Sequence, residues 1–165
     1  MKFRQGNIND LEEIKNLAIN SWQQFQNELT PENWEKLKTT LADDKTYSEL
    51  LNKSYCLVCI NDNNKIIGMS FLVLHGNPTE IYESSWCYIR FVTVDQNYSG
   101  QGIGRMLTEK CIQYAKKKGE KIVALHTSEM MNKARHIYKS LGFKILKEIE
   151  PRLGKKYWLY TLDIL

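Results

Sequence analysis

Up to residue 51, apolar residues recur at helical spacing. After Asp10 they follow one another three or four positions apart, which predicts a helix with one apolar face. Asp10 is of a residue type that caps helix N-termini. The pair Thr30-Pro31 predicts a second helix start, with threonine as the cap and proline at the first helical position. Residues 46–51 favour a further short helix. The apolar faces consist of Leu11, Ile14, Leu17, Ala18, Trp22 and Phe25 in the first helix, and of Trp34, Leu37 and Leu41 in the second.

From residue 55 the pattern changes to continuous apolar runs rich in β-branched and aromatic residues. Residues 55–60 and 65–74 are such runs, and the polar segment between them has turn-forming composition, so we expect an antiparallel hairpin. Residues 75–85 read as a surface loop and residues 86–94 as a third strand. The first six residues predict a short opening strand.

The remaining third of the chain alternates between the two periodicities. A helix is expected over residues 102–118, closed by a glycine, then a buried strand over 121–127 and a second helix ending at Gly142. Two closing strands, 143–149 and 155–165, would pair across the segment between them. The predicted order is β-α-α-β-β-β-α-β-α-β-β, typical of an α+β domain with a mixed sheet, and residues 1–165 contain no repeat or linker that would divide them.

Composition narrows the class of protein. The chain of 165 residues is 42% hydrophobic and 25% charged, which is ordinary for one globular domain. No apolar run approaches a bilayer span and the N-terminus lacks a signal-peptide core, so we expect a cytoplasmic protein without a membrane partner. The net charge of +4 is mild, and the cluster Lys116–Lys118 reads as a solvated helix end, so a nucleic-acid partner is disfavoured.

The four cysteines raise the question of a metal or redox site. Cys56 and Cys59 have CxxC spacing, but on a strand residues three apart point to opposite faces. No second CxxC or HxxxH motif completes a ligand set. We therefore expect buried free thiols and no metal.

The segment YSGQGIGRML, residues 98–107, has glycine at 100, 102 and 104 directly before a helix. A glycine-rich turn at a helix N-terminus presents backbone N–H groups where the helix dipole is positive, which suits phosphate oxygens. Arg105 either adds positive charge or points to solvent. The GxGxG spacing differs from the dinucleotide fingerprint and lacks the ending of a Walker loop. A turn without a ligand is the alternative.

Two segments carry a family resemblance. VTVDQNYSGQGIGRML and, after one further strand, ARHIYKSLGF resemble the two common segments of the GNAT superfamily of acyl-CoA-dependent N-acetyltransferases. The first matches the [QR]xxGx[GA] segment from Ser99, where the family usually has Gln or Arg, to Gly104. The predicted order of elements also fits that family, whose fold is a mixed, mostly antiparallel sheet with a splayed parallel strand pair and flanking helices.

The resemblance implies acetyl-CoA as the cosubstrate. The coenzyme would lie where the strands at 86–94 and 121–127 splay apart. Its pantetheine arm would pair with backbone groups of Val92, Thr93 and Val94. The residues that would hold the pyrophosphate through N–H groups are Ser99, Gly100, Gln101, Gly102, Ile103 and Gly104. Asn132 lies one place after the position where the family often has a coenzyme-contacting Asn.

The resemblance also implies catalytic roles. Tyr138 matches the family tyrosine that protonates the departing coenzyme sulfur, although its place on an apolar helix face also fits a core aromatic. For the general base we consider His126, which ends the strand after the glycine-loop helix, the carboxylates of Glu83 and Glu129, or a water chain. Trp86 and Tyr88 line the acceptor pocket or belong to the sheet surface; these two interpretations stay open.

The resulting hypothesis is an N-acetyltransferase that moves an acetyl group from acetyl-CoA to a primary amine of a small molecule or a protein N-terminus. A non-catalytic acyl-CoA-binding or sensor module is the alternative. An RNA-modifying acetyltransferase is disfavoured by the modest charge. The sequence leaves open the identity of the amine and whether the chain forms a homodimer.

Overall fold

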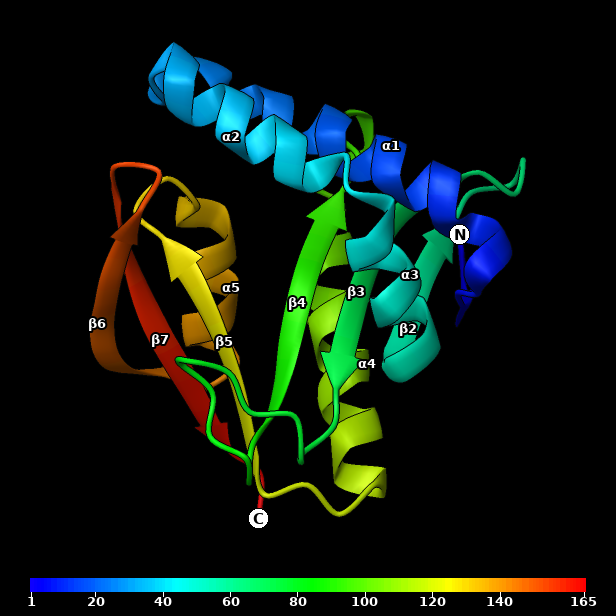
Figure 1. The fold of residues 1–165 in the computed structure, drawn as a ribbon. Helices are drawn as coiled ribbons and strands as arrows, with labels where there is room; N and C mark the ends of the chain where they lie inside the picture. The colour runs from blue at the N-terminus through cyan, green and yellow to red at the C-terminus, as the bar shows by residue number, and fades with distance from the viewer.

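The computed structural model describes all 165 residues and contains one seven-stranded sheet (Figure 1). The strand order is β1-β2-β3-β4-β5-β7-β6, and every neighbouring pair is antiparallel except β4 and β5. The strands are β1 (Lys2–Gln5), β2 (Tyr55–Ile60), β3 (Ile66–Val73), β4 (Cys87–Val94), β5 (Ile122–Ser128), β6 (Lys144–Arg152) and β7 (Lys155–Asp163). The helices are α1 (Leu11–Trp22), α2 (Pro31–Leu41), α3 (Asp44–Lys53), α4 (Ile103–Lys117) and α5 (Asn132–Ser140), with 3-10 turns η1 (Ile8–Asp10), η2 (Gln23–Glu28) and η3 (Gln96–Tyr98).

Helices cover both faces of the sheet. α1 and α3 pack on one face, against β2, β3 and β4, and α4 and α5 pack on the other (Figure 1). Each face has its own large hydrophobic cluster, one around Ile14, Phe71 and Leu159 and the other around Leu72, Cys111 and Tyr160. The predicted α+β class with a mixed, mostly antiparallel sheet is confirmed. All four cysteines are free and buried, as expected.

One predicted helix cap is correct and another is wrong. The hydroxyl of Thr30 accepts a hydrogen bond from the N–H of Asn33, and Pro31 opens α2. Asp10 does precede α1, but its side chain makes no capping bond to that helix. Its carboxylate instead accepts two hydrogen bonds of 2.9 Å from the guanidinium of Arg4 and a third from the N–H of Asn7. The bidentate charged pair outcompetes a single capping bond.

The C-terminal strands differ from the sequence expectation in extent and in position. β6 continues to Arg152, so the turn is only Leu153-Gly154, and both residues have positive φ, 55° and 73°. Two left-handed residues are the hairpin geometry that matches strand twist. β7 lies between β5 and β6, an order that the sequence pattern did not predict. β6 is therefore the edge strand, and the side chain of Arg152 at its end reaches His126 of β5 across β7.

The parallel pair in the middle of the sheet is short. β4 and β5 pair only at Cys87 with Val123 and at Tyr88 with Ala124. Beyond these residues the two strands diverge (Figure 1), and we call this unpaired stretch the fork. In the same stretch β4 carries a bulge opposite β3, where Phe91 has a φ of 55°. Positive φ at a bulky residue is strained, and a bulge bends the strand that carries it, here within the stretch where β4 is unpaired with β5.

The contact of β3 with α4 generates a stability prediction. A Cβ at Gly68 would lie 2.9 Å from Cγ2 of Ile103 and 3.2 Å from Cδ1 of Leu107. Ile103 is buried and β-branched and cannot move aside easily. We expect Gly68→Ala to lower the free energy of unfolding by about 1–3 kcal/mol in urea denaturation.

Gly104→Ala is the matched control for that substitution. Its Cβ would meet only ordinary contacts of 3.7 Å, and alanine favours the helical backbone. We expect it to be neutral or to stabilise by up to about 1 kcal/mol. Equal losses in the two variants would contradict the packing argument.

Candidate active site

The glycine loop connects β4 to α4 through two left-handed residues. Gly100 has a φ of 81° and Gly102 a φ of 77°. Around both, the space that a Cβ would occupy is open, so backbone conformation and not packing requires glycine there. Gly104 lies within the first turn of α4 and has no positive φ. Ile103 is buried in a small hydrophobic cluster with Leu107 and anchors the start of the helix.

The loop presents a row of free donors. None of the backbone N–H groups from Gly100 to Arg105 donates a hydrogen bond within the protein, and Gly102 caps α4 without a side-chain bond. Consecutive free N–H groups at a helix N-terminus form an anion-binding arrangement. The nearby cation is Lys133, whose Nζ is 3.4 Å from Oγ of Ser99. Arg105 turns away, to Glu109 at 2.8 Å and Ser140 at 2.6 Å.

Along the last residues of β4, the backbone groups point alternately toward β3 and toward the fork. The N–H of Asp95 donates to the carbonyl of Ile67 in β3, so strand alternation directs the backbone groups of Val94 toward the fork. Ser21 of α1 donates to the Val94 carbonyl at 3.0 Å. Thr93 is buried and paired with Met69 of β3, while Val92 is half-buried. The structure therefore brings Val94 to the fork and aligns Thr93 with β3.

Two other predicted site residues lie on α5. Asn132 is the exposed first residue of that helix. Tyr138 is buried between Phe143 and Tyr160, with ring centroids 5.8 Å and 6.5 Å away. Its hydroxyl makes no hydrogen bond to another residue, and burial raises its pKa. The ring is thus part of the core, and the phenol stays protonated with its donor unused.

His126 lies between a phenol and a guanidinium. Its Nδ1 is 2.5 Å from Oη of Tyr82, and its Nε2 is 3.3 Å from Nη1 of Arg152. A guanidinium can only donate, so Nε2 accepts and the proton of the neutral ring is assigned to Nδ1, which donates to Tyr82. Burial, followed by the charges of Arg152 and Arg90, lowers the pKa of His126 to about 4. At neutral pH the ring is uncharged and its lone pair faces Arg152.

The other candidate bases, Glu83 and Glu129, and the aromatic residues Trp86 and Tyr88 lie in different surroundings. Glu83 is exposed on the loop before β4, and the carboxylate of Glu129 accepts a hydrogen bond from the N–H of Lys156 at 3.3 Å. Trp86 is buried in the core, whereas Tyr88 stacks on Tyr82 with centroids 4.1 Å apart. The side chains next to His126 that the sequence did not single out are Tyr82, Arg90, Arg152 and Tyr157. They come from four separate segments, and no local motif marks them.

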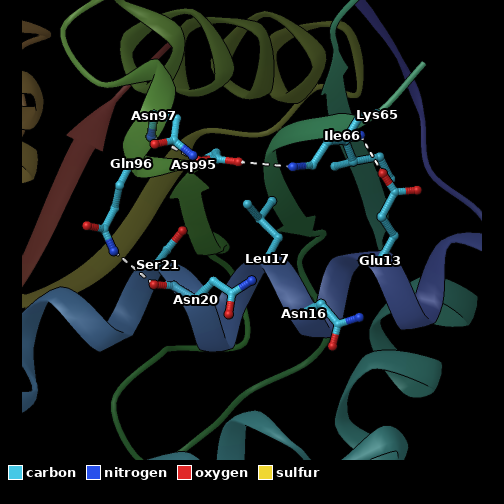
Figure 2. Close-up of a pocket in the computed structure, with 10 residues that line it drawn as sticks. All are labelled: Glu13, Asn16, Leu17, Asn20, Ser21, Lys65, Ile66, Asp95, Gln96 and Asn97. Atoms are coloured by element: carbon cyan, nitrogen blue, oxygen red, sulfur yellow. Dashed lines mark hydrogen bonds and ion pairs between the residues drawn. The ribbon is translucent and has the colours of Figure 1, made fainter. Parts of the chain in front are cut away.

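A polar hollow lies beside α1 and contains none of the predicted site residues. Its volume is about 500 Å³. Figure 2 shows its lining, with Lys65 directed to Asp95, Gln96 to the backbone of Asn20, and Glu13 to the N–H of Ile66. These contacts tie α1 to the start of β3 and to the segment after β4. Since they satisfy one another, we assign the hollow a structural role.

The structure has neither a metal-binding cluster nor a membrane-spanning helix. No group of three or more His, Cys, Asp or Glu side chains is arranged to bind a metal ion. None of the helices combines the length and the apolar character required to cross a bilayer.

Comparison with known proteins identifies relatives in sequence and in structure. Human N-acetyltransferase 8B is 30% identical over 108 residues, which cover 66% of this chain and 46% of that protein. N-acetylaspartate synthetase of Xenopus tropicalis is 28% identical over 117 residues, or 71% of this chain and 41% of that protein. The chain thus spans less than half the length of these relatives.

Solved structures share the fold at low sequence identity. PaiA N-acetyltransferase of Thermoplasma acidophilum, crystallised in complex with coenzyme A, has a TM-score of 0.80 at 16% identity and covers 99% of this chain and 98% of its own. Ribosomal-protein-alanine N-acetyltransferase of Brucella melitensis has a TM-score of 0.75 at 18% identity, covering 99% and 100%. The model of the acetyltransferase (GNAT) family matches residues 15–143. The chain belongs to the GNAT acetyltransferase family.

Proposed function

We propose that this protein transfers the acetyl group of acetyl-CoA to a primary amine. The observation that carries the proposal is the fork followed directly by the row of free N–H groups from Gly100 to Arg105. Unpaired strand backbone suits the amide groups of a pantetheine arm, and free N–H groups at a helix N-terminus suit a pyrophosphate. The structurally similar PaiA enzyme was crystallised with coenzyme A, which supports this cosubstrate.

The proposed reaction assigns separate tasks to the residues at the fork. The amine loses a proton to a base and attacks the thioester carbonyl, so that a C–N bond forms and the C–S bond breaks. The N–H of Val94, directed toward the fork, is placed to stabilise the oxyanion. Tyr138 supplies its proton to the departing thiolate. His126 is our candidate for the base, because its neutral ring carries an acceptor lone pair on Nε2.

One observation favours the alternative of a binding or sensor module. The His126 lone pair is occupied by Arg152, and the pKa of the ring is lowered to about 4, so the ring as it stands is a weak base. A sensor would bind acetyl-CoA and release no thiol. The test is a panel of primary amines with acetyl-CoA, read as free coenzyme A produced.

The names of the relatives do not agree on one class of acceptor amine. Relatives and structural neighbours include N-acetylaspartate synthetase, mycothiol acetyltransferase, ribosomal-protein-alanine N-acetyltransferase and aminoglycoside 6'-acetyltransferase. These names range from an amino acid derivative to a ribosomal protein. We therefore propose that the acceptor is a small-molecule amine or a protein N-terminus and not a nucleic acid.

Tyr138→Phe tests the acid role within that assay. Phenylalanine keeps the ring packing against Phe143 and Tyr160 and removes only the hydroxyl, which bonds no other residue. We expect kcat to fall about 10²- to 10⁴-fold where chemistry limits turnover, with acetyl-CoA affinity retained. A variant with the kcat of the wild type under those conditions would assign Tyr138 to the core alone.

Gly102→Val tests the anion-binding loop. A β-branched residue at a φ of 77° is strained, and its side chain would fill the open space beside the free N–H groups. Gly119→Val is the matched control, since Gly119 has the same φ of 77°, the same open surroundings, and lies after the opposite end of α4. We expect comparable losses of stability in the two variants, but weaker acetyl-CoA binding by calorimetry only in Gly102→Val.

The low pKa of His126 predicts a pH-dependent stability. The folded state holds a second proton on this ring only below about pH 4, whereas the free side chain takes up its second proton near pH 6.5. Between these values the unfolded state binds more protons, so stability is complete above pH 6.5 and falls as the pH drops toward 4. We therefore compare the free energies of unfolding of the wild type and of His126→Gln. The stability advantage of the wild type over the variant should shrink as the pH falls from 6.5 to 4. Parallel pH curves for the two proteins would contradict the burial of a neutral ring.

A further inference from the structure

The arginines of this chain divide into two groups. Arg4 pairs with Asp10, Arg105 pairs with Glu109, and Arg135 lies over Trp158 and donates to Oη of Tyr160. Arg90 and Arg152 form no ion pair with any carboxylate of the protein. Arg135 also lacks a carboxylate partner, but Trp158 and Tyr160 engage its guanidinium. Arg90 and Arg152 are the two arginines whose charges reach His126.

These two side chains reach the same site from different strands. Arg90 is half-buried on β4, with its guanidinium carbon 5.0 Å from the ring centroid of Phe91. Arg152 ends β6, 6.0 Å from the ring centroid of Tyr157 and in hydrogen-bond contact with His126. Both also act electrostatically on the hydroxyl of Tyr82. The charges thus converge on the Tyr82–His126 pair, on the face of the sheet that carries α1 and α3.

The charge of this site constrains the acceptor. A primary amine is protonated in water at neutral pH, and an ammonium ion entering beside two guanidinium groups is repelled. An acceptor that also carries a carboxylate removes this repulsion, because each guanidinium offers paired donors that match carboxylate oxygens. The aromatic rings of Tyr82, Tyr88 and Tyr157 limit the water around these charges and strengthen such contacts.

We propose that the acceptor is a small amino carboxylate, such as a free amino acid, whose carboxylate is bound by Arg90 and Arg152. The proposal rests on the acetyl transfer proposed above and narrows it, since a peptide N-terminus has an amide where a free amino acid has the carboxylate. Arg152 then acts as a positioning residue for His126. When its donors turn to the carboxylate, Nε2 of His126 is released and accepts the proton of the amine, while Nδ1 remains bonded to Tyr82.

The experiment compares each free amino acid with its own carboxamide as the acceptor, under saturating acetyl-CoA and with free coenzyme A as the readout. The carboxamide has a similar shape but no negative charge, and its amine is less basic. The lower basicity makes proton loss from the amine easier, so this effect by itself would make the amide the better acceptor. We expect kcat/KM to be roughly 10- to 100-fold higher for the preferred acid than for its amide. Arg90→Gln and Arg152→Gln should each abolish most of that preference, because they lower kcat/KM for the acid far more than for the amide. Lys116→Gln, at the far end of α4, controls for net charge.

A second measurement separates this inference from the transfer reaction itself. N-acetylated amino acids and their N-acetylated amides are titrated calorimetrically into the protein with coenzyme A present. If no amine releases coenzyme A, but the acids bind in preference to the amides and Arg152→Gln removes the preference, the transfer reaction is wrong and the carboxylate site stands. Equal use of acids and amides, or equal losses for both in the arginine variants, overturns the carboxylate site and leaves the transfer reaction in place. No preference for the acid in either assay also overturns it.

Discussion

The early separation of β4 from β5 is the constraint on which the rest of this molecule depends. Two paired positions, at Cys87 and Tyr88, hold the halves of the sheet together through the backbone. Unpaired backbone groups in a protein interior are costly, so a sheet that opens in its middle must satisfy them in another way. The hydrophobic clusters on the two faces both contain residues from either side of the fork, and they hold it open without ladder hydrogen bonds. The strained backbone of Phe91 is located where β4 leaves its neighbour.

The fork also separates the proposed acid from the proposed base. Side chains alternate along β5, so Ala124 and His126 face the side of α1 and α3, whereas Leu125 faces the side of α4 and α5, where Tyr138 is buried. In a closed sheet, the layer of strands would lie between the two groups. An acyl group lying in the fork could be approached from one face by the amine with its base and from the other by a proton donor. On the mechanism proposed above, the interruption of the sheet therefore lets two buried groups, one on each face, act on the same bond.

The features that the sequence predicted well are those set by local backbone chemistry. Gly100, Gly102, Gly119 and Gly142 all have positive φ, because a turn or a helix end needs that conformation whatever surrounds it. The features that it missed depend on which side chains meet across the sheet. Asp10 has the composition of a cap, but Arg4 of β1 takes its carboxylate. Likewise, nothing near His126 in the sequence indicates Tyr82 or Arg152, since Tyr82 comes from the loop before β4 and Arg152 reaches the ring from the edge strand β6, across β7.

The surroundings of His126 carry an electrostatic cost that packing alone does not explain. The guanidinium groups of Arg90 and Arg152 act on His126 without anionic partners, in a chain that has 19 acidic residues, and the ring is held neutral. On the mechanism proposed above, this arrangement keeps the base inactive until an acceptor arrives, because Arg152 occupies the lone pair that would take a proton. A free base beside a bound thioester would also activate water and hydrolyse acetyl-CoA. Coupling the release of the lone pair to the arrival of a carboxylate restricts the reaction to the intended amine, so the unfavourable charge serves selectivity rather than stability.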